Sequence, residues 1–275
     1  MDFIPLSRQD RIFFEENGYL VVPGLLDAEA IARFIAVGDR FMETAGPVHN
    51  FYANRYIDLL HDDALVALAA QSPAVSLVMQ LLSPDIHLMR ANAIYKHPQP
   101  LSREPVYPDG DGRSFRNWHR DLNNFAPNNP IRGTVAVRVG YCLTDFSQTN
   151  SGITLLVPGS HKLERPLAFA KGELDPPEFL ELSLAAGDAC IFSTSLYHTP
   201  AINFTDRIAK GMLIGYAYRF WAHKHLSPGE RTLASMDDIT AQLFGAEFEG
   251  GRVPLREWAC ERGLQVEDPP MLVFV

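Results

Sequence analysis

The chain has 275 residues, of which 47% are hydrophobic and 21% are charged. A chain of this length buries roughly 70–75% of the surface that it exposes when unfolded, so we expect it to fold without disulfide or metal staples. The formal net charge is −9. This charge argues against a nucleic-acid-binding protein, because such proteins present a basic surface to the phosphate backbone.

The cysteines and the N-terminal residues bear on the cellular compartment in which the protein is expected. Cys142, Cys190 and Cys260 are far apart and form no Cys-x-x-Cys pair, so neither a disulfide framework nor a thiolate zinc site is expected. The opening residues, MDFIPLSRQD, lack the basic and apolar regions of a signal peptide. No run of about 18 apolar residues indicates a membrane span. We therefore predict a cytoplasmic protein without a membrane or nucleic-acid partner.

The first part of the chain, about 1–85, is predicted to be mostly helical. Behind Asp27, a good N-cap residue, hydrophobic side chains recur at helical spacing. The predicted elements are a helix over 7–17, a short strand over 18–23, a helix that begins after Asp27, and a helical stretch over 63–81 that is interrupted at Ser72 and Pro73.

After about residue 86 the pattern changes to short β-rich runs separated by turn residues. These runs are 86–95, 115–121, 134–144, 153–157, 179–184, 189–193 and 207–221. Many short strands with regular turns are typical of an antiparallel sandwich or barrel. With helices before them, they predict a mostly β fold with flanking helices, a jelly roll buttressed on one face. We treat residues 1–275 as one domain, with a core at about 86–222 and a C-terminal extension over 223–275.

The sequence Asn117-Trp-His-Arg-Asp121 is the strongest local signal for chemistry. If this segment is a strand, residues 117, 119 and 121 project to one face, and His119 and Asp121 could share a metal ion. The best third ligand is His198, which follows a predicted strand. Two histidines and one carboxylate form the facial triad of non-haem iron(II) oxygenases. A His-x-Asp pair alone is a weak signal, and the spacing leaves the metal site and a purely structural role equally open.

Other histidines have simpler interpretations. His61 is followed by two aspartates but precedes a helical run, which favours a surface or capping role. His223 and His225 share a strand face without a further partner, so a polar surface segment is the favoured interpretation. Trp118 is expected to face away from His119 and to pack in the core.

Arg207 lies nine residues after His198, at the start of a predicted strand. Its guanidinium suits the far carboxylate of a dicarboxylate cosubstrate, because a guanidinium can bind a carboxylate through two hydrogen bonds. The alternative is a surface salt bridge to a nearby carboxylate. Lys210 points to the opposite side of this strand unless a bulge intervenes.

Five segments in order resemble the phytanoyl-CoA dioxygenase family of Fe(II)/2-oxoglutarate oxygenases. They are FEENGYLVVPGLLDAEAI (14–31), WHRD (118–121), LTDFSQTNSGITLLVPGSHK (143–162), AAGDACIF (185–192) and HTPAINFTDR (198–207). The resemblance implies a double-stranded β-helix, a cupin-like jelly roll. It also implies Fe(II) bound by His119, Asp121 and His198, with O₂ and 2-oxoglutarate as cosubstrates and succinate and CO₂ as products.

One departure concerns the cosubstrate. Many family members carry an arginine about eleven residues after the distal histidine, where this chain has Ala209. Arg207 fits if the loop is two residues shorter, and Lys210 is the alternative. Lys96 resembles a position that touches 2-oxoglutarate in some relatives, and Asn117 shares the expected metal-facing side of its strand. We therefore expect Arg207, Lys96 and Asn117 to contact the cosubstrate, although structural roles fit Lys96 and Asn117 equally well.

The combined interpretation is an Fe(II)/2-oxoglutarate-dependent dioxygenase that hydroxylates a small organic molecule. Asp121 is retained, whereas related halogenases lose this carboxylate, so hydroxylation is favoured over halogenation. Desaturation, epoxidation or rearrangement at the same iron site is an alternative, as are a non-catalytic cupin-like binding protein and a zinc-dependent isomerase or hydrolase. The loop over 98–116 is a candidate lid. The oligomeric state stays open.

Overall fold

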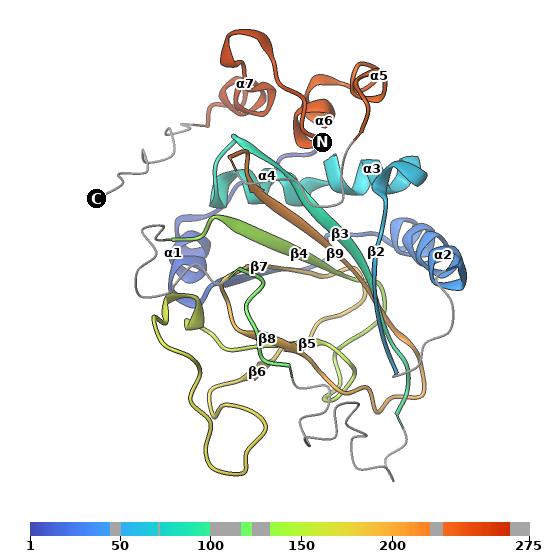
Figure 1. Cartoon of the computed structure of the whole chain (residues 1–275), viewed down its shortest axis with the longest axis vertical. Coiled ribbons are helices and arrows are strands. Elements are labelled where there is room, and N and C mark those ends of the chain that lie inside the picture. Colours follow the sequence, from blue (N-terminus) through green and yellow to red (C-terminus); the bar gives the residue numbers. More distant parts are fainter. Residues whose placement is uncertain (45–50, 71, 100–116, 123–132, 221–227, 265–275) are drawn as a thin grey trace.

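A computed structural model of the chain describes residues 1–44, 51–70, 72–99, 117–122, 133–220 and 228–264. Its strands form two sheets in which every neighbouring pair is antiparallel (Figure 1). The larger sheet has the order β1 (Tyr19–Val22), β7 (Ala189–Ser193), β4 (Ala136–Cys142), β9 (Ala209–Tyr218), β3 (Ile86–Lys96) and β2 (Tyr52–Tyr56). The smaller sheet has the order β6 (Leu180–Glu181), β5 (Thr154–Leu156) and β8 (His198–Pro200). This arrangement confirms the predicted jelly roll.

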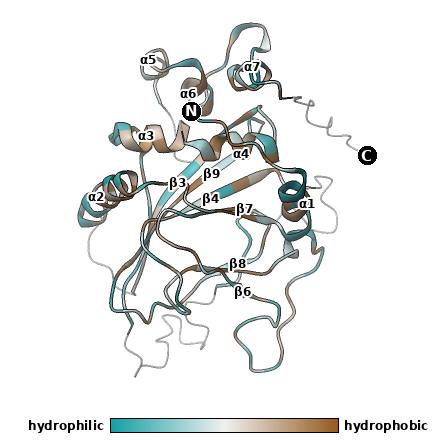
Figure 2. Ribbon diagram, turned by 180° about the vertical axis from the view of Figure 1, so that it is seen from behind, coloured by the Kyte–Doolittle hydropathy of each residue, from teal (hydrophilic) through white to brown (hydrophobic). Residues whose placement is uncertain are grey.

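Helices gather on the outer face of the larger sheet, as predicted (Figures 1 and 2). They are α1 (Arg8–Asn17), α2 (Ala28–Thr44), α3 (Asp63–Ala70), α4 (Pro73–Leu81), α5 (Glu230–Leu233), α6 (Asp238–Leu243) and α7 (Pro254–Glu261). Three short 3-10 turns, η1 (Leu59–His61), η2 (Ser160–Lys162) and η3 (Glu249–Gly251), complete the helical elements. The described part of the C-terminal extension thus adds α5 to α7 beside the helical layer of α3 and α4 (Figure 1).

The helices of the first part begin where side-chain caps satisfy their free amide groups. The hydroxyl of Ser7 accepts from the amide of Asp10, and the carboxylate of Asp27 accepts from the amide of Ala30. Ser72 caps α4, so the predicted interruption between α3 and α4 is confirmed. N-caps of this kind supply hydrogen bonds that the first turn of a helix lacks.

Successive side chains of β3 lie on opposite faces of the large sheet. Ala91, Ala93 and Tyr95 face the helices and join the large outer core. Arg90, Asn92, Ile94 and Lys96 lie on the other face, where they line the space between the sheets. Since successive residues of a strand point to opposite faces, one strand contributes both a hydrophobic face and a polar one.

Three predictions about strands need correction. Residues 117–121 do not form a regular strand, because His119 makes only an isolated bridge to His198. The predicted strands omitted β8, which begins at His198. Strand β2 lies in a part that was predicted to be mostly helical, and its sequence YANRY carries a strand-like pattern too short to stand out.

The segment Asp63–Leu81 has the length and hydropathy of a membrane span, with a mean hydropathy of 1.6. However, 71% of it is buried inside the fold. Tyr216 of the large sheet donates a hydrogen bond to the carbonyl of Ala69, which fixes α3 against the sheet. A buried core helix explains the apolar composition, and the expected absence of a membrane partner stays a prediction.

Candidate metal centre

The structure brings together the three residues that the sequence singled out. His119, Asp121 and His198 each offer one ligand atom, and these atoms lie within 4.8 Å of one another. Nε2 of His119 is 3.9 Å from Oδ1 of Asp121, and the two imidazole ring centroids are 4.3 Å apart. Two imidazoles and one carboxylate converging on one point are a donor set suited to a divalent transition metal.

A backbone bridge sets this geometry. The amide of His119 donates to the carbonyl of His198 at 3.1 Å, and the amide of His198 donates to the carbonyl of His119 at 3.0 Å. The amide of Leu122 donates to the carbonyl of Thr194, which ties the chain just after Asp121 to the end of β7. The ligand-bearing segment is therefore fixed at both ends even though it forms no regular strand.

Both histidines present the same ring nitrogen to the centre. Nδ1 of His119 is 2.6 Å from the carbonyl oxygen of Asn117, and Nδ1 of His198 is 2.9 Å from the carbonyl oxygen of Leu196. A carbonyl can only accept, so each neutral ring carries its proton on Nδ1 and keeps a lone pair on Nε2. The protein backbone thus selects the tautomer that a metal ligand needs.

His198 is held in its neutral form. It is 6% exposed, and burial lowers the pKa of its imidazole to about 4, although the neighbouring Asp121 carboxylate opposes this shift. A neutral imidazole at physiological pH is available to bind a metal without first losing a proton.

Two arginines hold the carboxylate of Asp121. Nη2 of Arg90 donates to Oδ1 at 2.7 Å, and Nε of Arg138 donates to Oδ2 at 2.8 Å. Burial raises the pKa of Asp121, but the charges of Arg138 and Arg90 outweigh burial and hold this pKa well below its usual range. Asp121 is therefore an anion throughout the physiological pH range.

A cavity of about 220 Å³ opens beside the three residues. Its walls come from the inner faces of both sheets and include polar side chains of β2 and β3. The lining residues are Tyr52, Asn54, Tyr56, Arg90, Asn92, Ile94, Lys96, His119, Asp121, Arg138, Thr154, Phe192, His198, Pro200 and Leu213.

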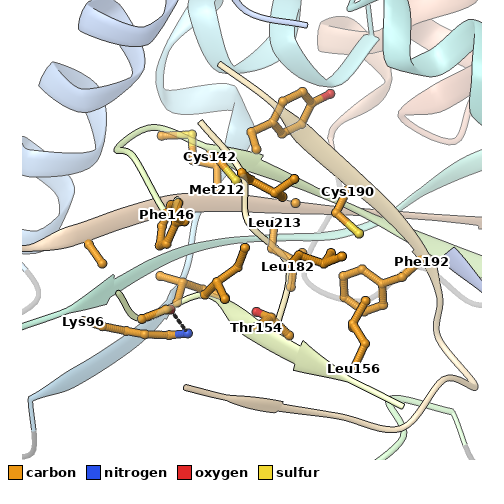
Figure 3. Close-up of a pocket in the computed structure, with 18 residues that line it drawn as sticks. Lys96, Cys142, Phe146, Thr154, Leu156, Leu182, Cys190, Phe192, Met212 and Leu213 are labelled. Carbon is orange, nitrogen blue, oxygen red and sulfur yellow. Dashed lines mark hydrogen bonds between the residues drawn. The ribbon is translucent and has the colours of Figure 1, made fainter. Parts of the chain in front are cut away.

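A mostly apolar pocket continues from this cavity between the two sheets, and Figure 3 shows its lining. The two spaces share Ile94, Lys96, Thr154, Phe192 and Leu213. Lys96 is the cationic residue among those that line the pocket, and its Nζ donates a hydrogen bond to the carbonyl of Gly152 (Figure 3). The ammonium group is 5% exposed and also lies 6.0 Å from the ring centroid of Tyr52. Lys96 thus brings a positive charge to the place where the cavity meets the apolar pocket.

The expected role of Arg207 is not supported. Its Nη2 donates to the main-chain carbonyl and to the carboxylate of Asp145, both at 2.9 Å, and its side chain is 42% exposed. Arg207 does not line the cavity among the described residues. The guanidinium therefore forms the surface salt bridge that was the alternative.

Lys210 also points away from the centre. Its Nζ binds the carboxylate of Asp39 in α2 at 2.7 and 2.8 Å, on the outer face of the sheet, as expected for a strand without a bulge there. Lys96 pairs with Ala209 across β3 and β9. The lysine thus lies beside the position where many relatives carry their arginine.

Two neighbours of the ligands have roles other than cosubstrate binding. Asn117 is exposed and contributes its main-chain carbonyl to His119 instead of its side chain to the cavity. Trp118 packs beside the apolar residues between the sheets, and its indole nitrogen donates to Asp175. The packing role predicted for Trp118 is therefore confirmed.

The structure tests the expectation for His61 but not those for His223 and His225. His61 is on the surface, 3.6 Å from Asp58, while Asp62 caps α3 through the amide of Ala64. His223 and His225 lie outside the described residues, as does most of the candidate lid, namely residues 100–116.

Sequence reasoning missed Arg90, Arg138 and Asn92. Nη1 of Arg138 lies 3.4 Å from the side-chain oxygen of Asn92, and the guanidinium is almost fully buried. A signal was present, because Arg138 is the charged residue of the otherwise apolar strand β4. Such residues are rarely buried without a partner, and the nearby Asp121 supplies it.

Comparisons with known proteins agree with this geometry. A family model described as phytanoyl-CoA dioxygenase (PhyH) matches residues 14–211. Peroxisomal phytanoyl-CoA dioxygenase of Rattus norvegicus is 24% identical over 243 residues, which cover 77% of this chain and 68% of the relative. Dioxygenase lolE1 of Epichloe uncinata is 25% identical over 266 residues, covering 86% and 96% of the two chains.

Solved structures share the fold. HygX from Streptomyces hygroscopicus, with nickel and 2-oxoglutarate bound, has a TM-score of 0.61 at 17% identity, and the match covers 79% of this chain and 89% of that one. The epimerase SnoN, in complex with Fe³⁺, alpha-ketoglutarate and a nogalamycin compound, has a TM-score of 0.58 at 20% identity and covers 76% and 82%.

Proposed function

Because the chain belongs to the phytanoyl-CoA dioxygenase family and is an Fe(II)/2-oxoglutarate-dependent oxygenase, we propose that it hydroxylates a small organic molecule at a centre formed by His119, Asp121 and His198. The observation that carries this proposal is the convergence of these three ligand atoms within 4.8 Å. The products of the cosubstrate are succinate and CO₂.

The residues of the centre fit a ferrous ion. Nε2 of His119 and His198 and a carboxylate oxygen of Asp121 are one anionic and two neutral ligands, which leaves open positions for an oxo acid and O₂. When bound, iron supplies the activation of O₂ that is coupled to decarboxylation of 2-oxoglutarate. The protein contributes the fixed tautomers of the imidazoles and the permanent charge of the carboxylate.

Lys96 takes the place that the sequence assigned to Arg207. Its ammonium group lies where the cavity continues into the apolar pocket, and it binds the distal carboxylate of 2-oxoglutarate. The methylene groups of the cosubstrate would pack against Ile94 and Leu213, which both spaces share. A charge-assisted hydrogen bond is strong in such apolar surroundings, because water does not compete for it.

Apolar side chains flank the inner side of the centre. Phe192 lies 5.1 Å from the ring of His198, and Leu156 and Leu213 are further apolar groups between the sheets. Exclusion of water protects a reactive oxidant from side reactions. The retained Asp121 carboxylate fills the ligand position that a halide would otherwise need, which supports hydroxylation.

A small-molecule substrate is supported by two kinds of evidence. The cavity beside the centre is lined by both polar and apolar groups, as small-molecule sites are. Among structures with the same fold, HygX has been solved with hygromycin B bound and SnoN with a nogalamycin compound.

The test is anaerobic reconstitution of the full chain with Fe(II), followed by addition of 2-oxoglutarate and O₂. We expect succinate formation that depends on Fe(II) and is suppressed when Zn(II) occupies the centre. The reaction without substrate is expected to be slow, and a screen of metabolites then identifies those that accelerate it. Absence of bound iron, or binding of 2-oxoglutarate without any turnover across the screen, would contradict an oxygenase and favour a binding protein.

A further inference from the structure

We propose that Arg90 binds a carboxylate group of the substrate and so selects an organic acid for oxidation. This inference rests on the function proposed above and assigns the substrate class of the same site. It arises from a surplus of positive charge around Asp121, because two guanidinium groups contact this single carboxylate.

Arg138 alone is sufficient to hold Asp121. Its side chain is 1% exposed, its Nε is 2.8 Å from Oδ2, and Asn92 contacts its Nη1. The guanidinium is thus buried and fixed on one oxygen of the carboxylate. A second cation is not needed to neutralise one negative charge, so Arg90 calls for a separate explanation.

Arg90 lies on the open side of the carboxylate. Its side chain is 20% exposed, compared with 1% for Arg138. Nη2 donates to Oδ1 of Asp121, Nη1 is 3.4 Å from the hydroxyl of Tyr56, and the buried Nε has no hydrogen-bond partner among the described residues. A guanidinium has five N–H donors, so Arg90 retains donors for a ligand in the cavity.

The oxygen that Arg90 contacts is the one that faces the metal centre. Oδ1 of Asp121 is the atom 3.9 Å from Nε2 of His119, whereas Arg138 holds Oδ2. A divalent cation held by His119, His198 and Oδ1 would repel the guanidinium of Arg90 and weaken Oδ1 as an acceptor. The Arg90 contact would then loosen while that of Arg138 to Oδ2 remains, so Arg90 would be available to a substrate anion.

Charge balance in the cavity supports an anionic substrate. Among the described lining residues, Arg90, Arg138 and Lys96 are cationic and Asp121 is the carboxylate. Fe(II) adds two positive charges and 2-oxoglutarate adds two negative charges. The cavity with both bound would therefore keep the excess of positive charge that its side chains give it. An excess of positive charge in a cavity of low dielectric constant favours binding of an anion.

The neighbouring side chains favour a carboxylate on an apolar body. The guanidinium carbon of Arg90 is 5.9 Å from the centroid of the Tyr56 ring, and Tyr52 lines the same wall. The tyrosine rings offer flat surfaces to an apolar or aromatic group. One available guanidinium matches the charge and planar shape of one carboxylate, whereas a phosphate dianion requires further donors.

The test uses two probes of equal size, 4-(trifluoromethyl)benzoate and 4-(trifluoromethyl)benzamide. Their binding to the full chain is followed by ¹⁹F NMR with Ni(II) and saturating 2-oxoglutarate present. Nickel keeps the centre from turning over, and 2-oxoglutarate blocks the metal and Lys96. We expect the benzoate to bind about tenfold more tightly or better, since a hydrogen-bonded ion pair adds about 1.5–3 kcal/mol.

Variants of the chain test whether Arg90 causes this preference for benzoate. Arg90→Gln should remove the preference for benzoate and leave benzamide binding unchanged, while Arg90→Lys should keep part of it because the charge remains. Arg40→Gln is the matched control, since Arg40 binds Asp62 at 2.8 Å on the surface. Equal affinity of the two probes for the wild-type chain, no binding of either, or an unchanged preference in Arg90→Gln would overturn the proposal.

Binding of 2-oxoglutarate is measured in the same samples from its ¹H signals. A chain that discriminates the probes through Arg90 but binds no 2-oxoglutarate contradicts the cosubstrate assignment and leaves the Arg90 site standing. A chain that binds 2-oxoglutarate but does not discriminate the probes contradicts the Arg90 site and leaves the proposed function standing. The two failures are therefore distinguishable.

Discussion

The main chains of His119 and His198 exchange two hydrogen bonds, of 3.1 and 3.0 Å, across a separation of 79 residues in the sequence. Residues that face each other in an antiparallel pair carry their side chains close together. This single bridge places the two imidazole centroids 4.3 Å apart and lets one segment, 119–121, supply the carboxylate as well. Backbone pairing between two distant segments thus positions the three candidate ligand side chains.

Removal of either imidazole should abolish metal binding. We expect His119→Ala and His198→Ala to lose Fe(II) affinity and succinate formation by more than about 100-fold, because even outer-sphere changes cost 10–100-fold. Iron content after anaerobic reconstitution and succinate yield measure the effect, with circular dichroism as the check on folding. Wild-type turnover in either variant would remove that residue from the centre.

The Michaelis constant for 2-oxoglutarate should depend on Lys96. Lys96→Met is expected to raise it about tenfold or more, because a buried charge-assisted contact to the distal carboxylate is lost. Arg207→Met and Lys210→Met are controls that remove a cation bound to Asp145 or Asp39 outside the cavity. If Arg207→Met raises this constant and Lys96→Met does not, the assignment of Lys96 is wrong.

Arg138 is expected to act as a positioning residue for Asp121. Arg138→Gln should lower the affinity for Ni(II) or Fe(II) by about 10–100-fold, since the ligand carboxylate loses the partner that orients it. Titration against a chelator of known affinity measures this. Because Arg138 is buried, Arg138→Lys is examined in parallel, and it should recover part of the affinity if charge contributes. An unchanged metal affinity in both folded variants would refute the role.

The stability of the metal-free chain should fall as the pH falls below neutral. The pKa of His198 is about 4 in the fold and about 6.5 in the unfolded chain, so the unfolded state alone binds a proton between these values. The contribution is fully present above pH 6.5 and is lost as the pH falls toward 4, by about 3 kcal/mol in total. Denaturant unfolding at several pH values should show this slope, and His198→Gln should flatten it. The buried His161, whose pKa is also lowered, adds a slope of the same sign that remains in this variant.

Gly18 should tolerate no side chain. Its φ is +81°, and a Cβ there would lie 2.5 Å from Nδ1 of His161. Gly18→Ala is therefore expected to lose about 2–4 kcal/mol of unfolding free energy through backbone strain and overpacking. Gly24→Ala is the matched control, because φ is +60° and no atom lies within 4 Å of the added Cβ. Chemical denaturation compares the two variants, and equal losses would show that the contact with His161 is unimportant.

The sequence by itself determined the class of fold and singled out the three candidate metal ligands. The change from helical to strand-like pattern near residue 86 reflects local periodicity, and His119, Asp121 and His198 stand in segments that resemble one family. The N-cap at Asp27 was also readable, because a cap and its amide lie within three residues of each other.

Only the tertiary structure decided which cationic side chains lie beside the centre. Arg90 on β3 and Arg138 on β4 meet Asp121 through sheet pairing, and Lys96 reaches the pocket because of the register of β3 with β9. Arg207 is close to the right place in the sequence, but its guanidinium binds Asp145 instead. The physical reason is that Arg207 lies in the bend before β9, outside the paired strands, and only the pairing of distant strands sets which side chains face the space between the sheets.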